Sequence, residues 1–364
     1  MMKLRSKAFL IIVLCALLSA CGDTNVVNSI KFVQTIGYDA VENGVTSSAI
    51  IANYEEQGKS KLEFYVTESK SIYDSMPKLN MKLDFPIEYG QLRMALFGER
   101  FARKGIKTAI ESLIRDPKIS SRTHLGVADR EALKILNIKE NRNDPYFMSD
   151  MIEQNIRYGN LPRINLHLTF FDFYGSGRDF FLPHFTVERD ELKLDGIALF
   201  KEDKFKTKIG IKDSFLMKLL MENSLNGSIM VPVTGSDQAG GDEFFLMNSI
   251  HSKTRYKVIQ TGPPASIAIK VKLDAQVKDV PQWIDLTSKE QIALLERCIE
   301  TYCQNEIRKF IALLQSNDVD PLGLGDLIRS RTKDWDPQAF QRHYKELSTT
   351  VSVTARIIRT GAGG

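Results

Sequence analysis

The longest regular pattern in the chain is LTSKEQIALLERCIETYCQNEIRKFIALLQ at residues 286–315. Apolar side chains recur in it at helical spacing, at Ile292, Leu295, Ile299, Cys303, Ile307, Phe310 and Leu314. Thr287 and Glu290 fit a capping box at its start, and Pro321 excludes its continuation. This pattern predicts one long helix whose single apolar face packs against another layer of structure.

Strand-like segments flank this helix on both sides. The runs 244–260 and 266–280 precede it, and the run 349–361 closes the chain. In the second run, the apolar side chains from Ile267 to Leu273 alternate with lysines, as expected for a half-buried strand. We therefore expect an α+β C-terminal domain at residues 239–364, with the long helix packed on antiparallel strands.

Strands and helices also alternate in the first half of the chain. Asn43-Gly44 lies between two strand-like runs and predicts a hairpin turn. A helix is expected over Glu68–Met76, stopped by Pro77, and a later short helix has Asp129 as its expected N-cap. This succession predicts an N-terminal mixed α/β domain at residues 21–186.

A smaller unit is expected between these two domains, at residues 187–238. It contains two strands around the polar turn KEDK, a helix capped by Asp213 or Ser214, and one more short strand. The Gly-rich run 234–243 predicts a loop or domain joint. The predicted fold class is thus α+β (mixed α/β), in three domains that are each a small sheet packed with helices.

Residues 1–20 have the organisation of a lipoprotein signal peptide. MMKLRSK is basic, and the following AFLIIVLCALLSA is an uncharged run that is too short to span a bilayer. The run ends in LSAC, which resembles the bacterial lipobox, with small residues at 19 and 20 and Cys21 at the new N-terminus. A cysteine is needed there because its thiolate accepts the diacylglyceryl group. The alternative is an ordinary cleavage site beside a chance cysteine.

The basic character of the sequence resides largely in that segment. The whole chain has 49 basic and 45 acidic residues, a net charge of +4. Removing Lys3, Arg5 and Lys7 with the signal peptide leaves 46 basic residues, a charge of +1. The remaining basic residues are spread evenly rather than clustered, so we expect no nucleic-acid partner.

No motif in the sequence indicates catalysis. The five histidines form no H-E-x-x-H motif, and the serines near glycine form no nucleophile elbow. LGLGDL at residues 322–327 lacks the third glycine of a dinucleotide fingerprint. Cys298 and Cys303 are expected to be packing thiols. We therefore predict a protein without a catalytic, cofactor or metal site, with Cys21 as its one functional residue.

Several stretches, in order along the chain, resemble the GerAC family, the C subunits of nutrient germinant receptors in endospore-forming bacteria. The stretches are GQLRMALFGERFARKGI (90–106), LIRDPKISSRTHLGVA (113–128), LDGIALFKEDK (194–204), DPLGLGDLIRSR (320–331) and VSVTARIIRTG (351–361). The resemblance implies a three-domain, non-catalytic lipoprotein on the outer face of the spore inner membrane. It would be held there by diacylglyceryl and N-acyl chains, such as palmitate, on Cys21, and would work with two polytopic membrane subunits in spore germination.

The sequence departs from that family at one position and leaves other classes open. Family members usually carry tryptophan after the lipid-bearing cysteine, where this chain has Gly22. A lipid-anchored solute-binding protein that feeds a transporter would also explain the lipobox, and it would have two similar doubly wound lobes around a cleft. An anchored cell-wall hydrolase would need a catalytic pair that the sequence does not display.

Overall fold

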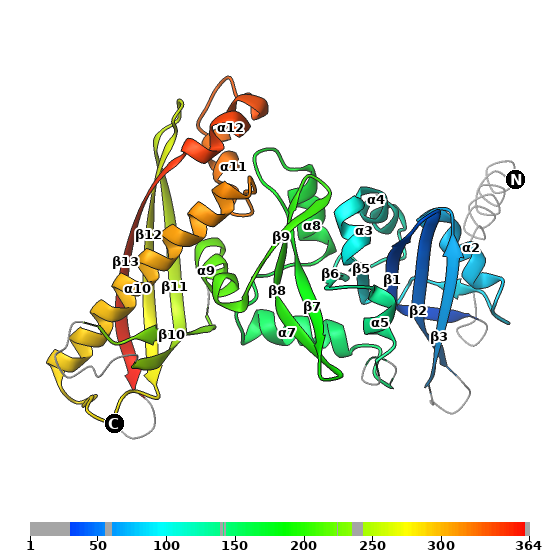
Figure 1. The fold of residues 1–364 in the computed structure, drawn as a ribbon, viewed down its shortest axis with the longest axis horizontal. Helices are drawn as coiled ribbons and strands as arrows, with labels where there is room; N and C mark the ends of the chain where they lie inside the picture. Colours follow the sequence, from blue (N-terminus) through cyan, green and yellow to red (C-terminus); the bar gives the residue numbers. More distant parts are fainter. Residues whose placement is uncertain are drawn as a thin grey trace, which may run out of the picture.

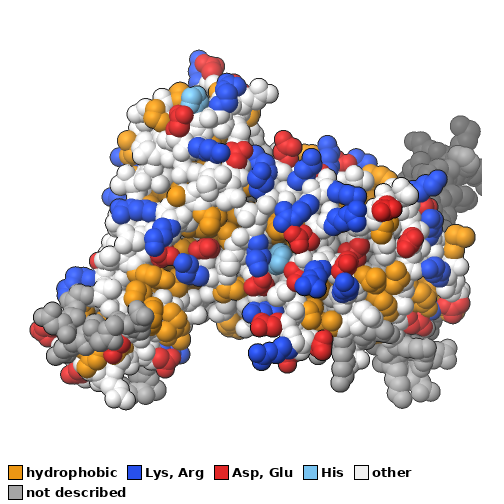
Figure 2. Space-filling model, viewed as in Figure 1, with side chains coloured by type: hydrophobic (Ala, Val, Ile, Leu, Met, Phe, Trp, Pro, Cys, Tyr) orange, Lys and Arg blue, Asp and Glu red, His pale blue; other side chains and the backbone are white. Residues whose placement is uncertain are grey.

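The computed structural model describes residues 30–54, 60–138, 141, 143–223, 225–234 and 243–360. Two β-sheets lie one after the other along the long axis of the molecule, the larger formed by the N-terminal part of the chain (Figure 1). Basic and acidic side chains are interspersed on the face shown in Figure 2. The fold is mixed α/β, as the sequence predicted.

The larger sheet has nine strands in the order β3-β2-β1-β5-β6-β7-β8-β9, with the short β4 paired to β1. β1, β5, β6 and β7 run parallel, and antiparallel pairs extend the sheet on both sides. The strands are β1 (Lys31–Val41), β2 (Gly44–Tyr54), β3 (Ser60–Ser69), β4 (Ile87–Glu88), β5 (Met94–Gly98), β6 (His124–Ala128), β7 (Phe181–Glu188), β8 (Glu191–Lys201) and β9 (Lys204–Ile209).

Short helices connect and cover these strands. They are η2 (Ile72–Asp74), α2 (Ser75–Asn80), α3 (Glu99–Lys104), α4 (Lys107–Arg115), α5 (Ala132–Leu136), α7 (Phe147–Arg157), α8 (Leu166–Tyr174) and α9 (Ile211–Met221). β5 and β6 are buried along their whole length, because parallel strands in the centre of such a sheet are covered on both faces.

The smaller sheet has the order β10-β11-β12-β13, with α10 lying diagonally across it in Figure 1. Its elements are β10 (Ser228–Pro232), β11 (Phe244–Gln260), β12 (Ser266–Lys278), α10 (Lys289–Ser316), α11 (Leu324–Arg329), α12 (Pro337–His343), η3 (Tyr344–Glu346) and β13 (Ser348–Thr360). Glu296 and Glu300 on α10 accept hydrogen bonds from the amides of Ile357 and Ala355. Through these bonds, α10 provides acceptors for two backbone N–H groups of β13, the edge strand of this sheet.

The long helix itself is confirmed, together with the burial of most of its predicted stripe. Its first residue is Lys289, and its N-cap is Ser288 rather than Thr287. The hydroxyl of Ser288 accepts from the amide of Gln291, whereas that of Thr287 donates to Asp285. The last strand, β13, pairs parallel with β12, so the expectation of a purely antiparallel C-terminal sheet was wrong.

Three local predictions in the first half of the chain were also wrong. Glu68 belongs to strand β3, and Pro77 lies in the first turn of α2. Backbone N–H groups in the first turn have no partner within the helix, so proline costs no hydrogen bond there. Asp129 does not cap α5, because a carboxylate from strand β1 occupies that position. The N-cap residue of α9 is Gly210, not Asp213 or Ser214.

The division into three domains remains a prediction. The boundary placed between residues 186 and 187 lies inside β7, and the larger sheet continues through β8 and β9. Helix α9 then lies between the sheets, where the carbonyl oxygens of Leu219 and Leu220 accept hydrogen bonds from Thr254 and Tyr256 on β11. Most of the predicted loop 234–243 lies outside the described residues.

Candidate functional site

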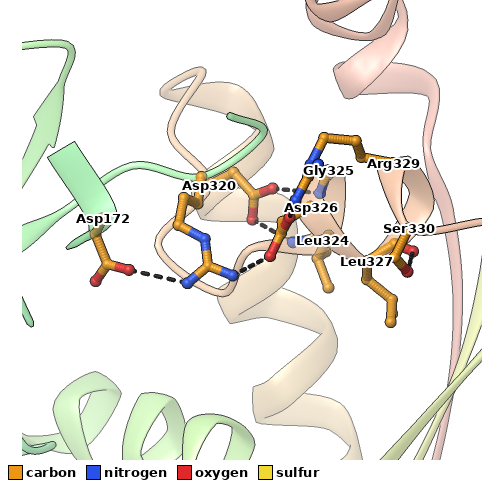
Figure 3. Close-up of polar contacts among 9 residues, drawn as sticks. Asp172, Asp320, Leu324, Gly325, Asp326, Leu327, Arg329 and Ser330 are labelled. Carbon is orange, nitrogen blue, oxygen red and sulfur yellow. Dashed lines mark hydrogen bonds and ion pairs between the residues drawn. The ribbon is translucent and has the colours of Figure 1, made fainter. Parts of the chain in front are cut away.

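Two loops that are distant in the sequence meet where the two sheets join. One follows α8, at residues 175–180, and the other follows α10, at residues 317–323, and leads into α11. The amide of Asp326 donates to the carbonyl oxygen of Gly177 at 2.7 Å, and the amide of Asp179 donates to that of Asp320 at 2.9 Å. We call this arrangement the sheet junction, and Figure 3 shows the polar contacts of Asp172, Asp320 and Asp326 within it.

Gly177 permits the close approach of the two loops. Its φ of +78° lies in the left-handed region, and a Cβ built on it would lie 2.7 Å from the amide nitrogen of Asp326. A side chain is therefore excluded here both by backbone conformation and by the neighbouring backbone.

Arg178 belongs to the loop after α8, and its side chain bridges two carboxylates. One of its terminal nitrogens lies 2.9 Å from Asp172 on α8, and the other donates to Asp326 at the start of α11 (Figure 3). Burial would lower the pKa of Arg178, but the hydrogen bonds to the two aspartates outweigh it and raise the pKa. Asp326 also accepts from Arg329; its partial burial opposes ionisation, but the two arginines lower its pKa.

Asp320 is the buried centre of the junction, with 4% of its surface exposed. Its two carboxylate oxygens accept hydrogen bonds from the amides of Leu324 and Gly325, at 3.0 and 2.7 Å. Burial raises the pKa of this carboxyl to about 7. The neighbouring Asp179 also has a raised pKa because of burial, although Lys201 lies 3.2 Å from it.

The contacts of these groups are those of a structural joint. The glycine-rich run 322–327, considered above as a nucleotide site, turns back on Asp320, and the amides of Leu324 and Gly325 already have that carboxylate as partner. The sequence offered one signal for the other half of the joint. In YGSGRD at residues 174–179, the two glycines mark a turn, and the Arg-Asp pair follows it directly.

Among the described residues, Cys298 and Cys303 lie outside the junction. Cys21 is outside the described residues, so its lipidation stays a prediction. Cys298 and Cys303 are buried free thiols, and burial raises the pKa of Cys303 to about 12. Across the described ranges, no group of three His, Cys, Asp or Glu residues could hold a metal ion. None of the helices in this part of the chain has the length and apolar character that crossing a bilayer would require.

Two family models together match nearly the whole chain. The model for the spore germination protein N-terminal domain matches residues 23–187, and the model described as spore germination B3/GerAC-like, C-terminal, matches residues 195–361. The chain belongs to the GerAC family of spore germination proteins. A role in spore germination follows from this membership.

Full-length relatives support the GerAC assignment. The spore germination protein GerQC of Bacillus cereus is 25% identical over 355 residues, which cover 97% of this chain and 98% of the relative. Spore germination protein KC of Bacillus subtilis strain 168 is 18% identical, with 97% and 95% covered. The crystal structure of the GerBC protein has the same fold, with a TM-score of 0.60, 16% identity, and coverage of 89% of this chain and 97% of that one.

Several of the stretches that resemble the GerAC family contact segments that are distant in the sequence. Residues 90–106 contact residues 194–204, where the amide of Ile106 donates to the carbonyl oxygen of Asp203 at 2.9 Å. Residues 320–331 form the C-terminal half of the sheet junction. The resemblance therefore falls on segments that fix the chain's long-range contacts.

Proposed function

We propose that this chain is the lipid-anchored, non-catalytic C subunit of a nutrient germinant receptor complex required for spore germination. Lipid on Cys21 holds it on the outer face of the spore inner membrane. There it works with two polytopic membrane subunits. Its lipid consists of a diacylglyceryl group on the sulfur and an N-acyl chain such as palmitate.

The observation that carries the proposal is the position of the lipobox relative to the family match. LSAC ends at Cys21, and the match begins at residue 23. Cleavage before Cys21 would therefore leave the family domains attached to the membrane by almost no intervening chain. One acyl chain binds a membrane only marginally, whereas two or more give a stable anchor.

A structural role agrees with the chemistry of the junction. Each of its four carboxylates, at Asp172, Asp179, Asp320 and Asp326, has a cationic or backbone N–H partner. Such groups hold the two sheets in a defined arrangement, which suits a subunit that presents a surface to partners.

The alternative of a solute-binding protein receives little support from the fold. Proteins of that class were expected to have two similar doubly wound lobes. Here the larger sheet has nine strands of mixed direction, and the smaller has four with a different order and a single long helix.

The lipid anchor is tested by replacing Cys21 with alanine in spores. We expect labelled palmitate to enter the wild-type protein but not the Cys21→Ala variant, and the variant to be lost from the membrane fraction and to impair nutrient germination. Cys15→Ala is the matched control, since Cys15 lies in the same apolar run and leaves with the signal peptide. A Cys21→Ala protein that remains on the membrane and supports germination would refute the anchoring role.

Partnership is tested by purifying the lipidated protein from spore membranes in mild detergent. The proposal predicts that mass spectrometry will identify two polytopic membrane proteins in stoichiometric amounts. Recovery of the protein alone, under conditions where the membrane proteins stay soluble, would contradict a role as receptor subunit. Release of cell-wall fragments by the purified protein would contradict the non-catalytic assignment.

A further inference from the structure

A polar cleft lies on the larger sheet unit, away from the sheet junction. It opens at the amino-terminal ends of β5 and β6, beside α7, and has a volume of about 750 Å³. A second hollow of about 500 Å³ continues it toward the segment between α9 and β10. Both are lined by Arg122, His124, Glu153 and Arg157, so we treat them as one cleft, the α7 cleft.

Positive charge predominates on the walls of the α7 cleft. Its cationic side chains are Arg93, Arg122, Arg157, Arg163 and Lys218, and its acidic ones are Asp150, Glu153 and Glu222. Burial lowers the pKa of His124, which leaves its ring neutral at pH 7. The lining therefore carries five positive charges against three negative ones.

Most of these cations have no carboxylate partner among the described residues. Glu222 lies 4.0 Å from Arg163, and Glu153 lies 3.0 Å from the neutral His124. Within the part of the chain that the structure describes, no carboxylate lies within 4.0 Å of a side-chain nitrogen of Arg122, Arg157 or Lys218. Arginines that project into a cleft without a counter-ion are available to a ligand.

Lys218 supplies the second, independent observation, because it is a buried cation. Only 2% of its surface is exposed, and its ammonium donates at 2.7 Å to each of the carbonyl oxygens of Ile156 and Gly159, at the end of α7. An ammonium has three N–H donors, and the third has no acceptor among the described residues. Burial of this charge lowers the pKa of Lys218, although the nearby Glu222 acts in the opposite direction. An anion in the cleft would offset that cost.

We infer that the α7 cleft binds a small molecule through a carboxylate or phosphate group. Arg122 and Arg157 contact the oxyanion from the shared wall, and Lys218 adds positive charge from the floor. The guanidinium fork suits carboxylates and phosphates, and each of the two hollows has a volume in the range of small-molecule sites. This inference concerns neither the lipid nor the membrane subunits, so its failure would leave the proposed function intact.

Calorimetry on the full-length protein in detergent tests the inference. Three probes are titrated separately in phosphate-free buffer: inorganic phosphate, succinate, and the soluble short-chain lipid dihexanoylphosphatidylglycerol. We expect at least one to bind, and its affinity to fall about tenfold in Arg122→Gln and in Arg157→Gln. Arg331→Gln is the matched control, as an exposed arginine outside the cleft, and should bind like the wild type.

Arg122 and Arg157 are exposed, so we expect their glutamine variants to fold like the wild type. Preference for phosphate, succinate or the lipid identifies the source of the oxyanion, and each preference supports the inference when it depends on Arg122 and Arg157. Absence of binding to all three probes at millimolar concentration would overturn it. So would binding that both arginine variants retain.

Discussion

The amide of Asp320 donates a 2.7 Å hydrogen bond to the carboxylate of Asp179, a residue 141 positions earlier in the sequence. The reciprocal backbone bond, from the amide of Asp179 to the carbonyl oxygen of Asp320, is 2.9 Å long. Two hydrogen bonds thus join these residues. They connect the loop before β7 of the larger sheet to the loop that follows α10. The stability of the molecule should therefore respond to changes at this junction.

Replacement of Asp320 by asparagine should destabilise the protein. The side-chain NH₂ of asparagine would face one of the two backbone N–H groups that now donate to the carboxylate. That buried N–H group would lose its acceptor. We expect the free energy of unfolding to fall by about 1–3 kcal/mol, measured by urea denaturation. Asp334→Asn, at an exposed position nearby, should change it by less than about 0.5 kcal/mol. Equal effects of the two changes would show that Asp320 does not hold the loop.

Replacement of Gly177 by alanine should also weaken the junction. The new Cβ would meet the backbone of residues 325 and 326 at 2.7 Å, and the φ of +78° disfavours any L side chain. A loss of more than about 1 kcal/mol in unfolding free energy is expected. Gly262→Ala is the matched control, because its Cβ would meet nothing within 4 Å. A Gly177→Ala protein as stable as this control would disprove the close approach.

Asp39 should be more important than Asp129 for the stability of α5. The Asp39 carboxylate, on β1, accepts from the amides of Ala132 and Leu133 at 2.7 and 2.8 Å. Asp39→Asn removes one of these bonds and should cost about 1–2 kcal/mol in denaturant unfolding. Asp129 accepts from the hydroxyl of Thr186, a bond that asparagine can retain, so Asp129→Asn should cost less. A larger loss in Asp129→Asn would restore Asp129 as the stabilising residue.

His184 should make stability depend on pH. Its ring is buried, its Nδ1 has no hydrogen-bond partner among the described residues, and burial lowers its pKa from 6.5 to about 4. Between these values the unfolded chain binds a proton that the folded chain does not, so stability decreases as the pH falls through this window. The unfolding free energy of the wild type minus that of His184→Phe should therefore fall by about 2–3 kcal/mol from pH 7 to pH 4. A difference that is constant with pH would contradict a neutral buried ring.

Patterns within one segment were sufficient to predict the regular elements of this fold. The hairpin at Asn43-Gly44 and the alternating strand from Ile267 formed as expected, because each depends on neighbours a few residues away. The long helix formed for the same reason. Apart from the direction of β13, the errors fell at the ends of elements, and at α5 a residue from a distant segment determines that end. Helix α5 begins where a carboxylate on β1 reaches its first amides, and that carboxylate lies 93 residues earlier in the chain.

Local patterns of residues are enough to predict the family, the mixed α/β class and the lipid site at Cys21. The parallel direction of β13 against β12 and the continuation of one sheet across residues 186 and 187 became evident from the three-dimensional structure. That structure alone placed Arg178 between two aspartates, and Arg122 and Lys218 on one cleft. Strand order, ion pairs and clefts arise from contacts between segments far apart in the chain, which no local pattern specifies.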